Sequence, residues 1–262
     1  MEGASPPRRP LYLAELSYPA ALALKEERPV VLIPVGATEA HGPHLPLGTD
    51  VYLSEELARR VQAALWQRGA SSVIAPSLAF AVTEFGAPFA GTVSLDAATA
   101  TAFYTGVLAG LLRAGFQRLC LVNSHLEAAH VQTLRAACAE VERRSGQPVA
   151  FPDNTERRWA RTLTDEFKRG SCHAGRYETS LLLAAAERSR LVDADKLRSL
   201  AANEEDFLRA VREGAGNFIT AGGPQAYFGD PAAATIAEGN DIYARLATMV
   251  LTVVNETWPP AA

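Results

Sequence analysis

Two kinds of apolar segment alternate along the chain. Short runs rich in β-branched residues, ended by Gly, Pro or Ser, predict buried strands at 29–36, 71–78, 117–124 and 147–152, with a further short strand at 91–95. Apolar residues at helical spacing predict helices at 51–69, 97–115, 127–146, 177–191 and 237–258. Asp96 stands where the N-cap of the second helix is expected.

This alternation is typical of βαβ units. It predicts an α/β fold whose sheet is mostly parallel and carries helices on both faces. We expect one domain over residues 1–262, with a flexible Pro-rich extension at 1–11. The segment 214–231 is rich in Gly and is interpreted as a loop or hairpin near the site. The charged runs at 156–161 and 204–213 are interpreted as solvated helix faces.

Composition excludes several classes of function. The net charge is -4 and the basic residues are scattered, which argues against nucleic acid and anionic membranes as partners. No signal-like apolar region opens the chain, and no apolar run approaches the roughly 20 residues of a spanning helix. The three cysteines lack CxxC spacing, so we expect reduced, buried thiols in a cytoplasmic protein. Cys172 lies beside a histidine and is the candidate for reactivity.

The histidines and several acidic residues gather in short segments next to predicted strand or helix ends. Glu39, His41, His44 and Asp50 follow the first strand, and His125, Glu127 and His130 follow the strand at 117–124. His173 precedes the helix at 177–191. Ligands of open α/β sheets bind outside the carboxyl ends of the strands, so we expect the first two groups to converge if the strands are neighbours.

Imidazole and carboxylate side chains together are typical ligands of Zn²⁺ and Mn²⁺. So many carboxylates exceed the needs of one catalytic zinc, and Asp50 is suited to bridge two ions. Plainer interpretations stay open for some residues. His130 is more simply a satisfied core histidine, and His44 is either a support for the ligands or part of a loop surface.

Five segments resemble the creatininase (creatinine amidohydrolase) family, in order and over nearly the whole chain. They read "PVGATEAHGPHLPLGTD", "FAGTVSLD", "VNSHLE", "HAGRYETS" and "GDPAAATIAEG". The resemblance implies a three-layer α/β/α sandwich, a binuclear zinc or manganese site, and a homo-oligomer, often a hexamer.

The resemblance also implies roles for individual residues. Glu39 and His125 would hold one ion, His41 and Glu127 the other, and Asp50 would bridge them. His173 would contact the substrate. Glu178 and His44 would orient the metal ligands without binding an ion themselves. A hydroxide formed at the ions would attack an amide carbon, and Glu127 or His173 would pass the proton to the leaving nitrogen.

Departures from the family pattern concern the substrate. Creatininases have tyrosine where this chain has Leu126, and they carry tryptophans that close over creatinine, whereas this chain has Phe151 near one such position and "KRGSC" at the other. The metal ligands therefore transfer, but specificity for creatinine does not. The primary hypothesis is a metal-dependent hydrolase of a small, possibly cyclic, amide.

Two alternative hypotheses remain. The family also includes deformylases of a formamido pyrimidine nucleotide and a peptidase of mycofactocin maturation, so a formamide deformylase or a peptide-trimming enzyme is the second hypothesis. A metal-binding relative without activity is the third. Glu84, Arg169 and Arg176 are candidates for binding a polar group at one end of the substrate, although such residues usually lie on the surface. A nucleotide-binding Rossmann fold is disfavoured because no GxGxxG follows the first strand.

Overall fold

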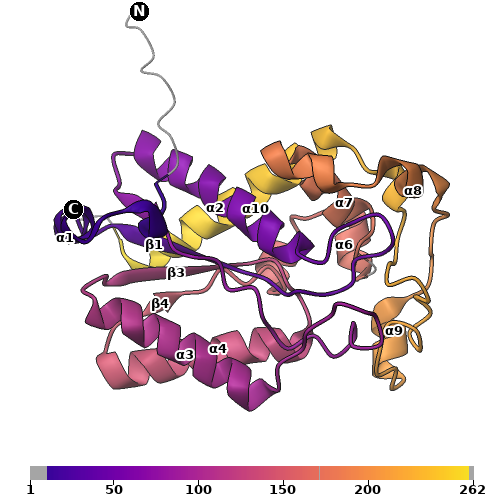
Figure 1. Ribbon diagram of the computed structural model, residues 1–262, viewed down its shortest axis with the longest axis horizontal. Helices are drawn as coiled ribbons and strands as arrows, with labels where there is room; N and C mark the ends of the chain where they lie inside the picture. Colours follow the sequence, from indigo (N-terminus) through magenta and orange to yellow (C-terminus); the bar gives the residue numbers. More distant parts are fainter. Residues whose placement is uncertain (1–10, 171, 260–262) are drawn as a thin grey trace, which may run out of the picture.

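A four-stranded parallel sheet forms the centre of the molecule (Figure 1). The computed structural model describes residues 11–170 and 172–259. The strands are β1 (Val30–Val35), β2 (Ser72–Ile74), β3 (Arg118–Asn123) and β4 (Val149–Ala150), in the order β2-β1-β3-β4. Each neighbouring pair is parallel. The predicted extension at 1–11 falls outside the described residues except for Leu11, whose carbonyl accepts a hydrogen bond from Ile74.

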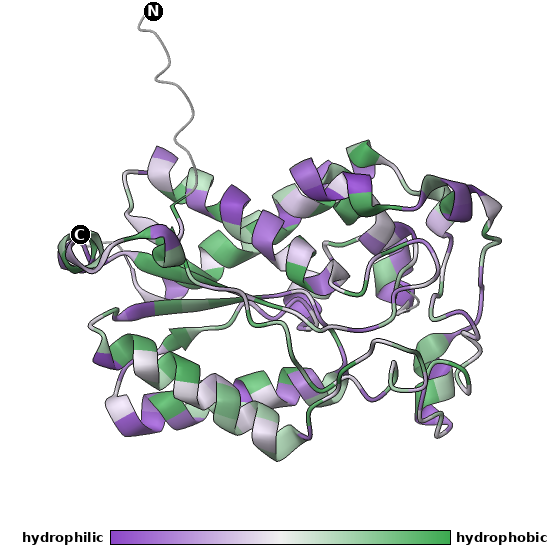
Figure 2. Cartoon of the chain, in the orientation of Figure 1, coloured by the Kyte–Doolittle hydropathy of each residue, from purple (hydrophilic) through white to green (hydrophobic). Residues whose placement is uncertain are grey.

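The central strands are apolar on both faces, which explains why they read as continuous apolar runs (Figure 2). Val30 and Leu32 of β1 belong to one core, and Val31, Ile33 and Val35 belong to the core on the opposite face. This alternation follows from the two-residue period of a strand.

Helices cover both faces, so the molecule is built in three layers (Figure 1). On one side lie α2 (Thr49–Gln67), α7 (Arg176–Ala184) and α10 (Ile236–Thr257). On the other side α3 (Ala97–Arg113) packs along α4 (Ala128–Ser145), and α1 (Tyr18–Glu26) adds Leu24 to their core. The predicted α/β class with a mostly parallel sheet is confirmed.

Four predicted elements differ from the structure in their extent. The strands expected at 71–78 and 147–152 are shortened to β2 (Ser72–Ile74) and β4 (Val149–Ala150). The strand expected at 91–95 is reduced to a single bridge between Ala81 and Ser94. The helix expected over 177–191 ends at Ala184, because Ala185 has an extended backbone conformation. The carbonyl of Ala184 instead accepts a hydrogen bond from the Arg60 guanidinium. A separate 3₁₀ segment, η2 (Ala186–Leu191), follows.

Several short helices were not predicted with defined bounds. They are η1 (Leu13–Glu15), α5 (Arg157–Ala160), α6 (Asp165–Arg169), α8 (Ala194–Ser199), α9 (Phe207–Arg212) and η3 (Pro231–Ala233). α5 and α9 lie within the runs interpreted as solvated helix faces. That interpretation is incomplete for α9, because Phe207 packs against Phe85 and Phe228. Within residues 11–170 and 172–259, every helix is too short or too polar to cross a bilayer.

Candidate metal centre

The site lies where β1 and β3 end side by side. Val35 is in register with Asn123, so the loop after β1 and the turn after β3 leave the sheet at the same edge. Gly36 permits a close approach of the next helix: a Cβ there would lie 2.5 Å from the Val51 nitrogen. The first turn of α2, which carries Asp50, can therefore press against the end of β1.

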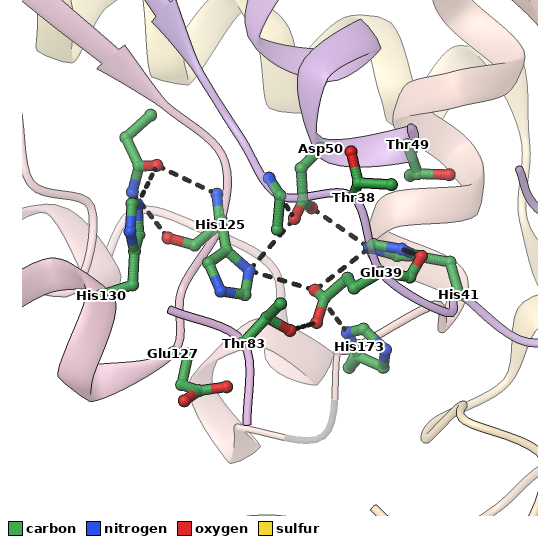
Figure 3. A network of polar contacts seen from close by, with 12 residues as sticks. Thr38, Glu39, His41, Thr49, Asp50, Thr83, His125, Glu127, His130 and His173 are labelled. Atoms are coloured by element: carbon green, nitrogen blue, oxygen red, sulfur yellow. Dashed lines mark hydrogen bonds and ion pairs between the residues drawn. The ribbon is translucent and has the colours of Figure 1, made fainter. Parts of the chain in front are cut away.

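Asp50 stands between two histidines from different loops (Figure 3). Its Oδ1 lies 3.1 Å from His41 Nε2, and its Oδ2 lies 3.1 Å from His125 Nδ1. His125 Nδ1 is also 3.0 Å from Oε1 of Glu39. These four side chains are almost wholly buried. The predicted convergence of the two strand ends is thus present in the structure.

The segment that leads into α7 closes the cluster from a third direction. Glu178 Oε2 lies 3.6 Å from His41 Nε2, and His173 Nδ1 lies 3.9 Å from Glu39 Oε1. Between them Ala174 has a φ of 48°, a left-handed conformation that is costly for a residue with a side chain. Its N–H donates to Glu178 at 2.7 Å. This strained turn aims both His173 and Glu178 at the same centre.

The three imidazoles share one hydrogen-bond pattern. His41 Nδ1 contacts the carbonyl of Glu39, His125 Nε2 that of Val82, and His173 Nε2 that of Ala40, at 3.1, 2.8 and 2.9 Å. Because a carbonyl only accepts, each of these nitrogens carries the proton. In the neutral ring the other nitrogen then turns a lone pair toward carboxylate oxygens. Lone pairs facing one another in a buried site are stabilised by a positive charge between them, either a proton on the ring or a metal ion, as in metal centres with carbonyl-anchored histidines.

The electrostatics of the cluster agree with this arrangement. Burial alone would lower the pKa of His41, but the carboxylates, Asp50 foremost, raise it to about 10. Burial raises the pKa of Glu178 to about 8, although nearby His41 opposes the shift. Burial and the neighbouring His41 lower the pKa of His173 to about 4, so its ring is neutral at pH 7. The carboxylates therefore strongly favour positive charge at the centre.

Among residues 11–170 and 172–259, three sets of donor atoms are close enough to hold a metal ion. One set is Glu39, Asp50 and His125, the second is His41, Asp50 and Glu178, and the third is Glu39, His41 and His173. In each set the donor atoms lie within 4.8 Å of one another. Their nitrogen and oxygen donors fit Zn²⁺ or Mn²⁺. Asp50 offers one oxygen to each of the first two sets, which suits a carboxylate shared by two ions.

Glu127 is placed differently from the expectation. Its carboxylate lies outside the three donor sets and accepts hydrogen bonds from the backbone N–H groups of Glu84 and Phe85, at 3.2 and 3.3 Å. Figure 3 shows it apart from the ligand cluster. The Glu84 carboxylate accepts from Ser94 on the surface. Leu126 and His173 do line the cavity above the centre, together with Glu127.

The remaining predicted residues lie further out. His44 Nε2 is 2.9 Å from the hydroxyl of Thr179, so it links the loop after β1 to the helix of Glu178. His130 is a core residue whose Nε2 meets Asn123 Oδ1 at 3.0 Å. Burial raises the pKa of the Cys172 thiol, so this cysteine stays protonated at the cavity wall.

Thr83 is a residue of the site that no motif pointed to. It is fully buried and its hydroxyl donates to Oε2 of Glu39, opposite the oxygen that faces His125. It comes from the segment between β2 and α3, whose sequence carries no cluster of ligands. In the sequence, Thr83 is a single threonine in a largely apolar segment, so nothing marks it as a residue of the site.

Replacing Thr83 by valine is expected to weaken metal binding by roughly 10- to 100-fold, because partners that orient a ligand contribute about that much. The shape of the side chain is kept, so the fold should persist. Competition with a chromophoric chelator measures the affinity. Thr248→Val, whose exposed hydroxyl only contacts its own helix, is the control. Equal affinities in the two variants would show that Thr83 does not position Glu39.

Comparisons with known proteins were made for the whole chain. The family model described as creatininase (creatinine amidohydrolase) matches residues 14–254. The mycofactocin precursor peptide peptidase of Mycobacterium ulcerans is 31% identical over 91% of this chain and 90% of its own length. The creatinine amidohydrolase of Pseudomonas putida is 34% identical over 37% of this chain and 38% of its own. A mutant creatininase of the Zn–Zn type superposes with a TM-score of 0.77 at 23% identity, over 97% of this chain and 100% of that one.

Proposed function

The chain belongs to the creatininase family, and from this premise we propose that it is a binuclear metal-dependent hydrolase that cleaves the amide bond of a short peptide. The observation that carries the metal part is Asp50, whose two oxygens face histidines from two different loops. The peptide part is supported by the relatives. The sequence match to the peptide peptidase spans 91% of the chain, whereas the sequence match to the creatinine amidohydrolase spans 37%, although a creatininase structure shares the fold over 97% of the chain.

We assign one ion to Glu39 and His125 and the other to His41 and Glu178, with Asp50 shared. Glu178 thus takes the place that the family resemblance had suggested for Glu127, because its carboxylate lies beside His41. Divalent ions bound in this way lower the pKa of a water molecule and polarise a carbonyl oxygen.

In the proposed reaction, side chains of this protein transfer the protons. Glu127 lies in the cavity with its carboxylate held by two backbone N–H groups, so it is oriented without being a ligand. Burial raises the pKa of Glu127, which brings a carboxylate closer to the range useful for proton transfer. In the proposed reaction Glu127 takes a proton from the attacking water and delivers it to the leaving nitrogen. His173, neutral and stacked on Phe218, borders the opposite side of the centre and contacts the substrate there.

Hydrolysis of a small cyclic amide such as creatinine is the second candidate. It is favoured by the resemblance in the metal-binding segments and by the partial match to the creatinine amidohydrolase. Leu126 at the cavity wall, where creatininases carry tyrosine, speaks against it. The predicted homo-oligomer and the cytoplasmic location stay predictions.

The proposal is tested by metal analysis together with a substrate panel. We expect about two ions per chain, and hydrolysis that stops after chelation and returns with Zn²⁺ or Mn²⁺. The panel contains creatinine, a formamide and short peptides, and peptides should be turned over fastest. Unchanged turnover after complete chelation would refute the metal-dependent mechanism. Preference for creatinine would refute the peptide assignment and establish the second candidate.

A further inference from the structure

A cavity of about 330 Å³ lies over the metal centre. Its floor is polar and contains Glu39, Asp50, His125 and Glu178. Its walls, in contrast, are largely apolar and come from segments far apart in the sequence: Phe85, Phe167, Phe207, Leu208, Val211 and Phe218. A cavity that combines apolar walls with a few convergent polar groups is typical of a small-molecule site.

Three of the wall residues form an aromatic cluster. The ring centroids of Phe85 and Phe207 are 5.3 Å apart, and Phe218 lies 5.9 Å from each. Rings at such distances pack favourably and present a preformed apolar surface. A polar group placed against this surface would lose its hydration without gaining hydrogen bonds, whereas a bulky apolar group would gain the full benefit of burial.

The cavity also has one fixed positive charge. Among the described residues that line it, Lys168 of α6 is the only lysine or arginine. The Lys168 ammonium lies 3.1 Å from Asp165, and both side chains are considerably exposed. Ion pairs of this kind contribute little free energy, so Lys168 can exchange Asp165 for a ligand at small cost.

The charge balance of the cavity favours an anion. Four carboxylates line it, those of Glu39, Asp50, Glu127 and Glu178. Two divalent cations would neutralise these four charges, and Lys168 would remain as the one uncompensated charge among the lining residues, since its partner Asp165 does not line the cavity. Arg169 and Arg176, the cations that the sequence singled out, are not among the residues that line the cavity, and Arg176 is paired with Glu238.

We propose, building on the hydrolase function above, that the substrate ends in a residue with a bulky apolar side chain and a free carboxylate. The aromatic cluster receives the side chain, and Lys168 binds the carboxylate. Lys168 is therefore a specificity-determining residue, and cleavage takes place near the C-terminus of a peptide rather than within a long chain.

Calorimetric binding of three probes to the zinc-loaded protein tests this inference. The probes are N-acetyl-L-phenylalanine, its primary amide, and N-acetylglycine. The free acid should bind roughly 10- to 100-fold more tightly than the amide, as expected when a charged hydrogen bond is lost. It should also bind more tightly than N-acetylglycine, which lacks the ring. Equal affinity for all three, or no binding of the aromatic acid at millimolar concentration, would overturn the proposal.

Variants separate Lys168 from the metal ions, which could also attract a carboxylate. In Lys168→Met the preference for acid over amide should vanish while the preference for phenylalanine over glycine remains. Arg169→Met, on the same helix but outside the cavity lining, should keep both preferences. An acid preference that survives in Lys168→Met would refute the role of Lys168. Because binding is measured rather than turnover, failure of the hydrolase assignment alone would leave these expected preferences intact.

Discussion

Replacing Asp50 by asparagine is expected to release both metal ions and to lower kcat/KM by roughly 10³-fold or more, equivalent to about 4 kcal/mol of transition-state stabilisation. The reason is geometric. The two oxygens of Asp50 face His41 and His125 separately, so a neutral amide removes a ligand from both donor sets at once. Loss of a residue that merely supports a ligand should cost only roughly 10- to 100-fold in affinity.

Metal content after dialysis, measured by elemental analysis, gives the direct readout. Glu56→Gln is the matched control, because Glu56 is also a buried carboxylate of α2 but pairs with Arg59 and Arg60 away from the site. Circular dichroism should show that both variants fold. If Asp50→Asn kept two ions, Asp50 would not be the shared ligand, and the binuclear assignment would fail.

The sheet and its long helices could be predicted because each has a strong local signal. β1 and β3 are apolar on both faces, and α3 begins at Asp96, which caps the Thr99 N–H as expected. The short helices α6 and α9 also have capped N-termini, at Thr164 and Asp206, but they are too short to show a helical repeat of apolar residues. α6 is held in place by contacts with residues distant in the sequence. The Glu166 carboxylate accepts hydrogen bonds from the backbone N–H groups of Arg176, Tyr177 and Asp230. Tertiary contacts of this kind cannot be read from local spacing.

Convergence of the ligands could be predicted for the same reason as the sheet. Glu39, His41, Asp50 and His125 follow the ends of two strands that prove to be neighbours. The position of Glu178 beside His41 could not be predicted, because its direction depends on the left-handed turn at Ala174, where nothing in the residue type signals a positive φ. Lys168 could not be singled out as a cavity residue, because a lysine on a short charged helix resembles any surface residue in the sequence.

Replacing Glu127 by glutamine is expected to leave both ions bound and to lower kcat by roughly 10²- to 10⁴-fold, the range typical of lost acid–base catalysis. The N–H groups of Glu84 and Phe85 bind different oxygens of Glu127, so the carbonyl oxygen of glutamine keeps one of these two hydrogen bonds and its NH2 group cannot accept the other. Glutamine nevertheless has nearly the same shape and should stay at the cavity wall. It cannot accept and release a proton. KM should therefore change little, because the wall of the cavity is preserved.

This variant also decides between two assignments of the second metal site. The donor atoms group Glu178 with His41 and Asp50, whereas the family resemblance had placed Glu127 there. If Glu127 were a ligand, Glu127→Gln would lose about one ion per chain, and Glu178→Gln would not. We expect the reverse: Glu178→Gln should lose metal and Glu127→Gln should keep it while losing turnover. Elemental analysis of the two variants side by side, with kcat measured on the same samples, separates a ligand from a proton carrier.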